Sequence, residues 1–505
     1  MSRELSRRSF LKTAGIALAG AAGTWLAGCK PREVVVEKVV KETVLVEGEE
    51  KVVEKVVKET VLVEKEVELE PQPPVTIEFW GWPSLVWDDK VAAFQEQHPN
   101  ITVNLSEIGD AVFGSQKYLT AVAAGVGPDV AIAGRHTFAQ YASRGMFVNV
   151  TPYFDLDGFK RSDWLDFAFE ESTWDGQLYG MMIDTDVRFL YWNRSHFEEA
   201  ELDPNKPPTT YAELAEYTER LTQYDSRGEV ERYGFVPYLY GNSWTWLYAF
   251  ARKAPSLSED KRTVLCDDPL WAETLEWMVD FYDNYVGDFE LANTFSQGIS
   301  AAGLGSPFDA GKVSMVADGN WSVASRLRDP DLDWDAAVMP IPLGGELATW
   351  SCAWNLVMPP TVKHPEAGWE LMKWWTTEEG WRAEAEAQKA ETARVWQREQ
   401  IEGVPQYWPT LACYLPALEM LEDEFISELG EREQRTWGVQ QTLLYNYTRG
   451  CGGEMGLAAL TYWVEMDNET RMALSHEKSP REAMLDCKEK VQQATDEAWE
   501  AIDAG

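Results

Sequence analysis

Histidine and basic side chains are scarce in this sequence. Its 505 residues include 5 His, and 45 Lys and Arg stand against 84 Asp and Glu, which gives a formal net charge of −39 at pH 7. Such an acidic chain repels the phosphate backbone of nucleic acids, so we expect no nucleic-acid partner. We attribute the excess of acidic residues to solubility in salty or acidic surroundings rather than to ligand choice.

Motifs of common metalloenzymes, serine hydrolases and nucleotide-binding proteins are also missing. The sequence has no HExxH, GxSxG or Walker A pattern, and Gly303-Leu304-Gly305 lacks the third glycine of a dinucleotide-binding loop. We therefore expect no catalytic residues of these classes, no cofactor and no metal site.

Cysteine is sparse and irregularly spaced. None of the six cysteines belongs to a CxxC pair. Beyond Cys29, five remain: Cys266, Cys352, Cys413, Cys451 and Cys487. They allow at most two intramolecular disulfides and leave one thiol over, and their spacing does not decide the pairing.

The length and apolar content predict a large globular protein. A chain of 505 residues is too long for one hydrophobic core, which predicts two globular units. Apolar residues make up 45% of the chain, and this share excludes a wholly disordered protein. We expect no transmembrane segment after residue 28.

The first 29 residues have the features of an export signal followed by a lipidation site. Residues 6–12, SRRSFLK, form a twin-arginine signal, and the uncharged residues 13–28 are too few for a permanent membrane helix. Leu26-Ala27-Gly28-Cys29 resembles a lipobox, where a bacterial lipoprotein is cleaved and its new terminal cysteine acylated. We expect residues 1–28 to be removed, and Cys29 to anchor the protein on the outer face of the cell membrane through two or more acyl chains. A short anchor left uncleaved is the alternative.

Residues 29–74 have the composition of a repetitive tether. Residues 33–46, EVVVEKVVKETVLV, recur almost unchanged as residues 50–63. Paired valines every four residues would make a helical stripe, whereas so many β-branched residues favour extended structure, and periodicity alone does not decide.

From residue 75 onward, predicted strands and helices alternate. Residues 75–80, 101–108 and 130–133 are predicted strands, with helical segments between them. This pattern is typical of a mostly parallel α/β lobe, whose ligands bind where loops leave the carboxyl ends of the strands. Residues 80–84 and 133–138 are therefore expected at a rim.

The clearest local pattern follows at residues 181–191. Polar and apolar residues alternate there as in one extended strand, with Asp184, Asp186 and Arg188 on a single face. Further on, Thr210 opens a capping box ahead of a helix with an apolar stripe.

These patterns resemble family 1 extracellular solute-binding proteins of the maltose-binding type. The resemblance rests on Asp186 followed by Trp192-Asn193, the helix start PPTTYAEL, a strand ending in Gly-Asn-Trp at Trp321, the helix start HPEAGW, and the helix pair joined at Ser479-Pro480. It covers most of residues 75–497 and is weakest over residues 391–453.

The resemblance implies an α/β, two-lobed, type II periplasmic-binding-protein-like fold behind an N-terminal tether, with a mostly parallel sheet flanked by helices in each lobe. One lobe would hold residues 75–185 and about 352–398, and the other residues 186–351 and about 399–505. The implied function is that of the monomeric solute-binding component of an ABC importer. It would capture a sugar, expected to be a neutral oligosaccharide, between its lobes and deliver it unchanged to membrane permease subunits.

Tryptophan supplies many of the candidate ligand contacts. An indole face suits the axial C–H groups of a sugar, although core packing is the commoner role for any single tryptophan. Six of the 24 lie at predicted strand ends or glycine turns: Trp80, Trp82, Trp244, Trp321, Trp350 and Trp354. The other expected ligand contacts are Ser84, Arg135, His136, Asp184, Asp186, Tyr238 and Asn242. The family's sugar binders carry an acidic residue at the position of His136, and this difference leaves the ligand open.

Other functions remain as alternatives. Asp184 and Asp186 would lie roughly 6.5–7 Å apart on one strand, a separation that also serves inverting glycosidases. Both would approach a bond from the same side, which favours binding over hydrolysis. A binding protein for a cationic solute and a structural or signalling lipoprotein are the further alternatives.

Overall fold

The computed structural model describes residues 32–46, 49–63, 73–108, 116–135, 137–239, 244–303, 305–450 and 454–504. The chain divides into two compact units, Met1–Gln72 and Pro73–Gly505. Cys29 and the export signal lie outside the described residues, so the predictions made for them are unchanged.

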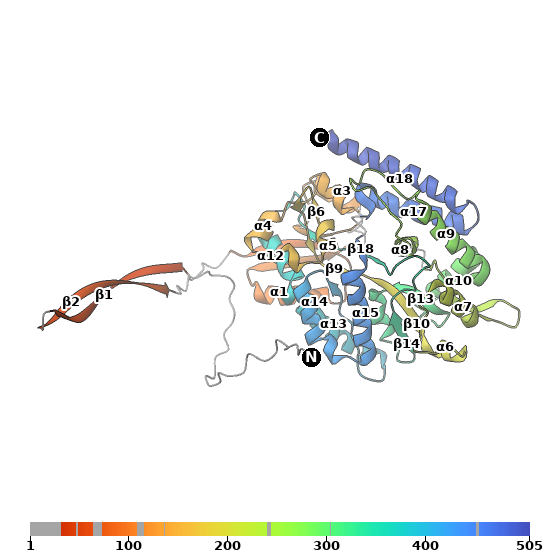
Figure 1. Ribbon diagram of the computed structural model, residues 1–505, viewed down its shortest axis with the longest axis horizontal. Coiled ribbons are helices and arrows are strands. Elements are labelled where there is room, and N and C mark those ends of the chain that lie inside the picture. The colour runs from red at the N-terminus through yellow and green to blue at the C-terminus, as the bar shows by residue number, and fades with distance from the viewer. Residues whose placement is uncertain are drawn as a thin grey trace, which may run out of the picture. The chain divides into compact units, whose positions relative to one another are not determined.

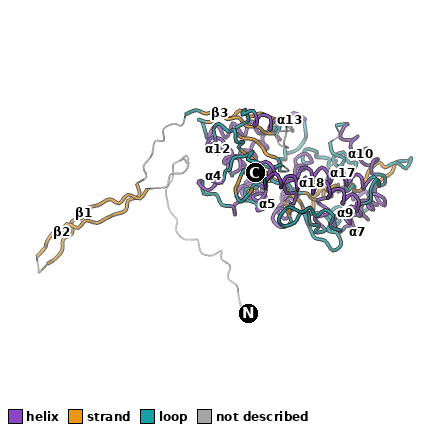
Figure 2. Tube along the Cα trace, turned by 90° about the horizontal axis from the view of Figure 1, so that it is seen from above, coloured by secondary structure: helices purple, strands orange, loops and turns teal. Residues whose placement is uncertain are grey.

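The repeat in the first unit forms a β-hairpin. Strand β1, Arg32–Val46, pairs antiparallel with β2, Glu49–Val63, so that Arg32 lies opposite Val63 and Val46 opposite Glu49 (Figure 2). The repeat therefore adopts the extended structure that its many β-branched residues favour.

The second unit contains two five-stranded sheets (Figure 1). The first has the order β4-β3-β5-β16-β8, formed by Ile101–Glu107, Val75–Gly81, Val130–Ala133, Asn355–Val357 and Met181–Met182. The second has the order β11-β12-β13-β10-β14, formed by Gln223–Tyr224, Val230–Phe235, Val313–Gly319, Arg188–Asn193 and Trp334–Ala337. Three neighbours in the first sheet, β4, β3 and β5, are parallel, whereas in the second only β12 and β13 are. Both sheets are therefore of mixed orientation rather than mostly parallel as expected, because the crossing strands β8, β10 and β16 pair antiparallel with their neighbours.

Helices surround both sheets (Figure 1). On the side of the first sheet they are α1 Trp87–Gln97, α3 Phe138–Ser143, α4 Thr151–Leu156, α5 Asp166–Glu171, α12 Pro365–Thr376, α13 Glu378–Glu399 and α14 Leu415–Glu424. Helix α2, Gln116–Ala123, shares a buried cluster with β5 of this sheet. On the side of the second they are α6 Arg194–Glu199, α7 Tyr211–Leu221, α8 Thr245–Ala251, α9 Pro269–Phe281, α10 Phe289–Ala301, α15 Glu431–Asn446, α17 Ala459–Leu474 and α18 Pro480–Asp503. The short helix α11, Val323–Arg326, follows β13 in the chain.

Residues 181–191 do not form the single strand expected from their alternation. They are divided between β8, β9 (Asp184–Thr185) and β10, and each piece pairs in a different sheet. β8 belongs to the first five-stranded sheet, β9 pairs with β17 (Leu411–Ala412), and β10 belongs to the second five-stranded sheet. The strand is broken because this segment carries the chain from one sheet to the other, and its pairing partners change on the way.

A second segment makes the return crossing beside the first. Strand β15, Thr349–Ser351, pairs in parallel with β18, Thr448–Gly450, and the chain then enters the first sheet as β16. The Arg188 backbone N–H donates to Thr349 Oγ1 at 2.9 Å, and the hydroxyls of Thr185 and Ser351 are hydrogen-bonded. The two crossings are therefore joined by hydrogen bonds.

The helix cap predicted at Thr210 is present, and the structure has two further caps at Asn193 and Ser479. Asn193 accepts a hydrogen bond from the backbone N–H of His196, and Thr210 Oγ1 accepts from that of Glu213 at 3.1 Å. Ser479 and Glu482 form a complete capping box at the start of α18. These short-range features were predictable because each depends on neighbouring residues alone.

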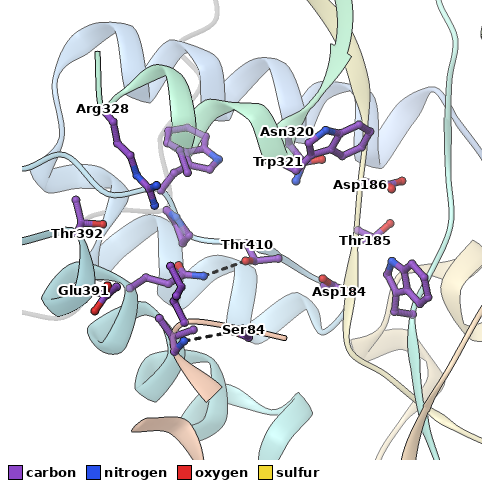
Figure 3. Close-up of a pocket in the computed structure, with 17 residues that line it drawn as sticks. Ser84, Asp184, Thr185, Asp186, Asn320, Trp321, Arg328, Glu391, Thr392 and Thr410 are labelled. Atoms are coloured by element: carbon purple, nitrogen blue, oxygen red, sulfur yellow. Dashed lines mark hydrogen bonds between the residues drawn. The ribbon is translucent and has the colours of Figure 1, made fainter. Parts of the chain in front are cut away.

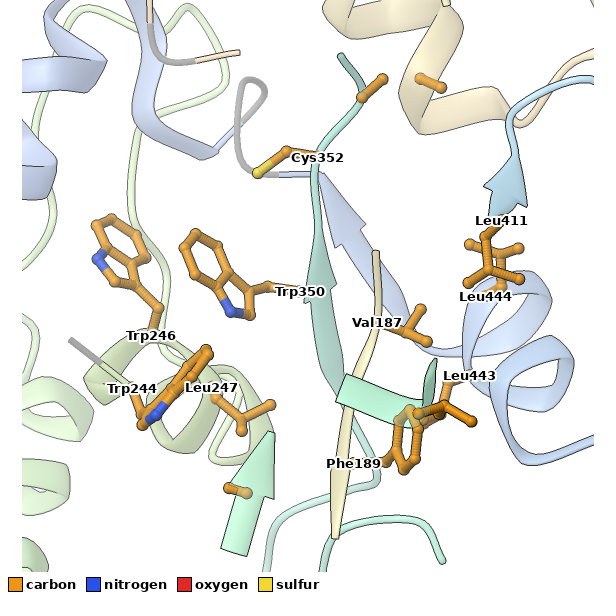
Figure 4. Packing of buried hydrophobic residues seen from close by; sticks show 14 of the residues in the cluster. Val187, Phe189, Trp244, Trp246, Leu247, Trp350, Cys352, Leu411, Leu443 and Leu444 are labelled. Atoms are coloured by element: carbon orange, nitrogen blue, oxygen red, sulfur yellow. The ribbon is translucent and has the colours of Figure 1, made fainter. Parts of the chain in front are cut away.

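Most large aromatic side chains pack inside the protein rather than face solvent. Trp350 stacks with Trp246 and with Trp463, whose ring centroids are 6.4 and 5.1 Å away. Figure 4 shows Trp350 and Trp246 within this buried cluster. Buried Cys266, Cys413 and Cys487 are free thiols, and Cys352 is disulfide-bonded. Among the helices that the structure describes, none is long and apolar enough to cross a membrane.

Candidate functional site

A cavity of about 400 Å³ lies against the first crossing segment (Figure 3). Its volume is in the range that holds small-molecule ligands. The residues that line it come from the loop after β3 (Ser84, Leu85, Val86), the crossings (Asp184, Thr185, Asp186, Trp354), the turn and helix after β13 (Asn320, Trp321, Ala324, Arg328), α13 (Gln388, Glu391, Thr392), and the loop before β17 (Trp408, Pro409, Thr410). Segments far apart in the sequence therefore form one site.

Asp186 is held by two arginines. Its Oδ2 accepts a hydrogen bond from Arg135 Nη1 at 2.7 Å, and its Oδ1 accepts one from Arg188 Nη1 at 2.5 Å. Burial acts to raise the pKa of Asp186, but the charges and hydrogen bonds of the two arginines outweigh burial and lower it. Asp186 is therefore an ionised carboxylate whose two oxygens already have strong donors.

Arg188 lies among tryptophan rings. Its guanidinium carbon is 4.4 Å from the ring centroid of Trp350, 5.1 Å from that of Trp321 and 5.5 Å from that of Trp244. Burial lowers the pKa of Arg188 to about 10, although the nearby Asp186 charge opposes this change. The side chain stays cationic at neutral pH, and its charge is stabilised by Asp186 and by the faces of the rings.

Asp184 has a different environment from Asp186, although only one residue separates them. Its Oδ1 is buried and has no hydrogen-bond partner among the described residues. Burial, together with the negative charges of Glu384 and Asp186, raises the pKa of Asp184 to about 8. The two acids therefore favour opposite protonation states at neutral pH.

Two tryptophans present aromatic surface to the cavity. Trp321 is 49% exposed, which is unusual for so large a side chain. It lines the cavity, and its ring lies close to the backbone of Gly319. A Cβ added at Gly319 would come within 2.0 Å of the Trp321 ring, so the ring position depends on glycine there. Trp354 also lines the cavity and packs edge-on against Trp82 at 5.0 Å.

The structure places five of the expected ligand contacts at this cavity: Ser84, Asp184, Asp186, Trp321 and Trp354. Trp82 and Arg135 do not line the cavity but contact Trp354, which does. Whether any of them touches a ligand stays a prediction.

The remaining expected contacts lie away from this cavity or outside the described residues. Trp350, Trp244 and Tyr238 are buried in the interior, and Tyr238 donates its hydroxyl to Asp467. Trp80 packs beneath Lys117. His136 and Asn242 lie outside the described residues, so the predictions made for them are unchanged.

Several lining residues were not anticipated from the sequence. Gln388, Glu391 and Thr392 share one face of α13, and Trp408 and Thr410 precede the two-residue strand β17. Asn320 Oδ1 accepts from the backbone N–H of Val187, which fixes the turn beside the first crossing. Trp408 precedes a proline just before a strand, and this sequence position was the one feature that could have marked it as a cavity residue.

Two known binding proteins have sequences similar to this chain. A Brucella abortus protein named only as a binding protein is 23% identical over 309 residues, which cover 58% of this chain and 68% of the relative. The maltotriose-binding protein of Pyrococcus abyssi is 23% identical over 270 residues, 51% of this chain and 52% of its own length.

Solved structures share the fold. CpMnBP1 with mannotriose bound superposes with a TM-score of 0.63 at 22% identity, covering 83% of this chain and all of the other. The GacH receptor of Streptomyces glaucescens, solved unliganded and with acarbose, gives a TM-score of 0.63 at 18% identity, covering 84% and 98%. These neighbours are two-lobed sugar-binding proteins, and the two sheets joined by paired crossings give this chain the same two-lobed α/β fold.

The sequence pattern of one family matches residues 90–393, which is more than half of the chain. This match includes both crossing segments, the four strands of the second sheet that lie between the crossings, and all three cavity-lining residues of α13. The chain belongs to the bacterial extracellular solute-binding protein family.

Proposed function

We propose that this protein captures an uncharged oligosaccharide in the cavity beside Asp186 and delivers it to the permease of an ABC importer. The observation that carries the proposal is the exposed indole of Trp321, which lines the same cavity as Trp354, Asp184 and Asn320. Aromatic faces suit the C–H surface of a sugar, and the polar groups suit its hydroxyls. The mannotriose and acarbose held by proteins of the same fold support a carbohydrate ligand.

The proposal assigns one lobe to residues 75–185 and about 352–398, and the other to residues 186–351 and about 399–505. The sheet memberships of β3, β5 and β16 on one side and β10 and β13 on the other support this division. Helix α14 departs from it, because it packs against α13 of the first lobe. Ligand contacts from both lobes are needed because only differential affinity can shift an open form toward a closed one. The closed monomer would then dock on the permease.

We also propose twin-arginine export and lipid anchoring through Cys29, supported by residues 6–12 and the lipobox. Membrane and soluble fractions of cells that express the full chain would test this. Cys29→Ala should move the protein from the membrane fraction to the soluble fraction. Retention of Cys29→Ala in the membrane would contradict lipidation at this residue.

A thermal-shift screen of neutral oligosaccharides, polyols, amino sugars and sugar phosphates tests the ligand class. A ligand present at 100 times its dissociation constant adds about 2.7 kcal/mol of stability, which gives a measurable rise in melting temperature. We expect neutral oligosaccharides to raise it and sugar phosphates to leave it unchanged. A rise with sugar phosphates or amines alone would contradict the proposed ligand.

Glycoside hydrolysis is the second candidate. The pKa of Asp184 is raised and that of Asp186 is lowered, as in the general acid and the ionised carboxylate of a glycosidase. Against it, both oxygens of Asp186 are engaged by arginines, so the carboxylate is not free to attack or to activate water. Analysis of the sugar after prolonged incubation decides between the two. The binding function predicts that it is recovered unchanged.

A further inference from the structure

The Asp184 carboxyl group borders the cavity, and one of its oxygens lacks a hydrogen-bond partner among the described residues. This oxygen, Oδ1, is buried. An unsatisfied buried polar atom costs about 1–3 kcal/mol, so such an atom at a binding cavity is expected to have a partner supplied from outside the chain.

The charged groups around Asp184 do not offer it a counter-charge. It is faced by Glu384 on α13, Asp186 in its own segment, Lys90 on α1, Arg135 after β5 and Cys413 after β17. Both cations already have carboxylate partners. Lys90 Nζ is 2.8 Å from Glu384 Oε2, and Arg135 Nη1 is 2.7 Å from Asp186 Oδ2. An ionised Asp184 would therefore meet two carboxylates and no uncommitted cation among these groups.

Gln388 lines the same cavity and also has a buried oxygen without a hydrogen-bond donor among the described residues. Its Nε2 donates to Thr410 Oγ1 at 3.1 Å and to Glu384 Oε1 at 3.3 Å, which fixes the orientation of the amide. Its Oε1 is buried and has no partner among the described residues. Gln388, Thr410 and Asp184 all line the one cavity. Figure 3 shows Thr410 and Asp184 there.

We propose that Asp184 works as an uncharged carboxylic acid and forms, with Gln388, the subsite that selects a ligand end bearing adjacent uncharged hydroxyl groups. A carboxylic acid both donates and accepts a hydrogen bond, and a hydroxyl group does the same. The inference rests on the proposed function and adds the chemical class of the end group. The raised pKa of Asp184 supports it, since the group is then mostly protonated at pH 7.

This subsite would discriminate by charge. A phosphate or carboxylate end group would lie near ionised Asp186 and would leave Asp184 and Gln388 without the donors they need. An ammonium end group would favour the ionised form of Asp184 and would release its proton on binding. Neutral hydroxyl groups satisfy both residues without a change in protonation.

The protonation state can be tested without a ligand, by infrared spectroscopy of the full-length protein between pH 6 and pH 10. We expect the C=O band of one protonated carboxyl group at pH 7, lost as the pH rises past 8, and absent from Asp184→Asn. Asp331→Asn, at an exposed turn residue, is the matched control and should keep the band. A wild-type spectrum without the band at pH 7 would overturn the uncharged acid.

The subsite can be tested by titration calorimetry with mannotriose and maltotriose at pH 6.5 and pH 9.5. We expect the dissociation constant of the wild type to rise about tenfold at the higher pH, and that of Asp184→Asn to stay constant. Asp184→Ala and Gln388→Ala should each weaken binding about tenfold at pH 6.5. Unchanged affinity in both alanine variants, or tighter binding of glucosamine than of either trisaccharide, would overturn the subsite. Failure of the wild type to bind either trisaccharide would instead contradict the proposed function, and the infrared result would still decide the protonation of Asp184.

Discussion

Arg135 Nη1 lies 2.7 Å from Asp186 Oδ2, and this contact joins the loop after β5 to the first crossing segment. Arg188 binds the other oxygen of the same carboxylate and also donates to the Trp350 carbonyl oxygen in the return crossing. Asp186 therefore connects both crossings to the first sheet. Its main contribution is to hold the crossings in place at the floor of the cavity.

Asp186→Ala should destabilise the protein strongly, because it leaves Arg188 buried without its carboxylate. Removing one partner of a buried ion pair costs about 3–5 kcal/mol. Urea unfolding, followed by tryptophan fluorescence, measures the change in the free energy of unfolding. Asp331→Asn serves as the control. If Asp186→Ala lowers the free energy of unfolding by less than about 1 kcal/mol, Asp186 is not needed to stabilise the two arginines.

Lys90→Met should be similarly costly. Lys90 is fully buried on α1 and pairs with Glu384 on α13, so its removal leaves an uncompensated carboxylate. We expect a loss of about 3–5 kcal/mol in the free energy of unfolding, measured by urea denaturation. Lys90→Met combined with Glu384→Leu should recover most of it. A double variant no more stable than Lys90→Met would contradict this explanation.

Trp321→Ala should weaken sugar binding with little change in stability, because half of the indole is exposed and it lines the cavity. We expect the dissociation constant for the bound oligosaccharide to rise at least about tenfold, which corresponds to about 1.4 kcal/mol. Calorimetric titration measures this. Leu343→Ala, at an exposed residue that does not line the cavity, is the control and should bind as the wild type does.

Gly319→Ala tests the same contact from the backbone side. The added methyl group would overlap the Trp321 ring and displace it, so sugar affinity should fall as it does in Trp321→Ala. Gly298→Ala, at a helix position where a methyl group meets nothing within 4 Å, provides the comparison. Equal affinities in the two glycine variants would mean that the ring position does not matter for binding.

The pH dependence of stability should change when Asp184 is replaced by asparagine. The folded state raises the pKa of Asp184 from 3.8 to about 8, so folding favours the protonated form. The contribution of this group to stability is fully present below pH 4 and is lost as the pH rises through 8. The stability of the wild type relative to Asp184→Asn should therefore fall between about pH 4 and pH 8, by up to about 1.4 kcal/mol per pH unit. Parallel curves in urea unfolding would show that Asp184 is not perturbed.

Much of the fold could be predicted because its signals are local or periodic. The strand that ends at Gly-Asn-Trp, the cap at Thr210 and the helix pair at Ser479 each depend on residues close together in the sequence. The broken crossing strand could not be predicted in this way. Its alternation is regular, but β8, β9 and β10 pair with strands more than 100 residues away, and the sequence pattern does not record a change of partner.

The candidate site was predictable only in part. Trp321 and Trp350 both stand at strand or turn positions, yet the structure exposes the first and buries the second beneath α8 and α17 side chains. The wall formed by α13 and Trp408 was missed because residues 391–453 resemble the family least and β17 has only two residues. Lys90 lies within the apolar face of α1 formed by Trp87, Val91 and Phe94. A lysine at such a position could have indicated its buried ion pair with Glu384 of α13.

The most direct test of the account is a crystal structure of the protein with the neutral oligosaccharide that stabilises it most in the thermal-shift screen. We predict an intact sugar in the cavity, with one ring against Trp321 and hydroxyl groups bonded to Asp184 and Gln388. A cleaved sugar, or a sugar bound elsewhere while this cavity holds only water, would contradict it.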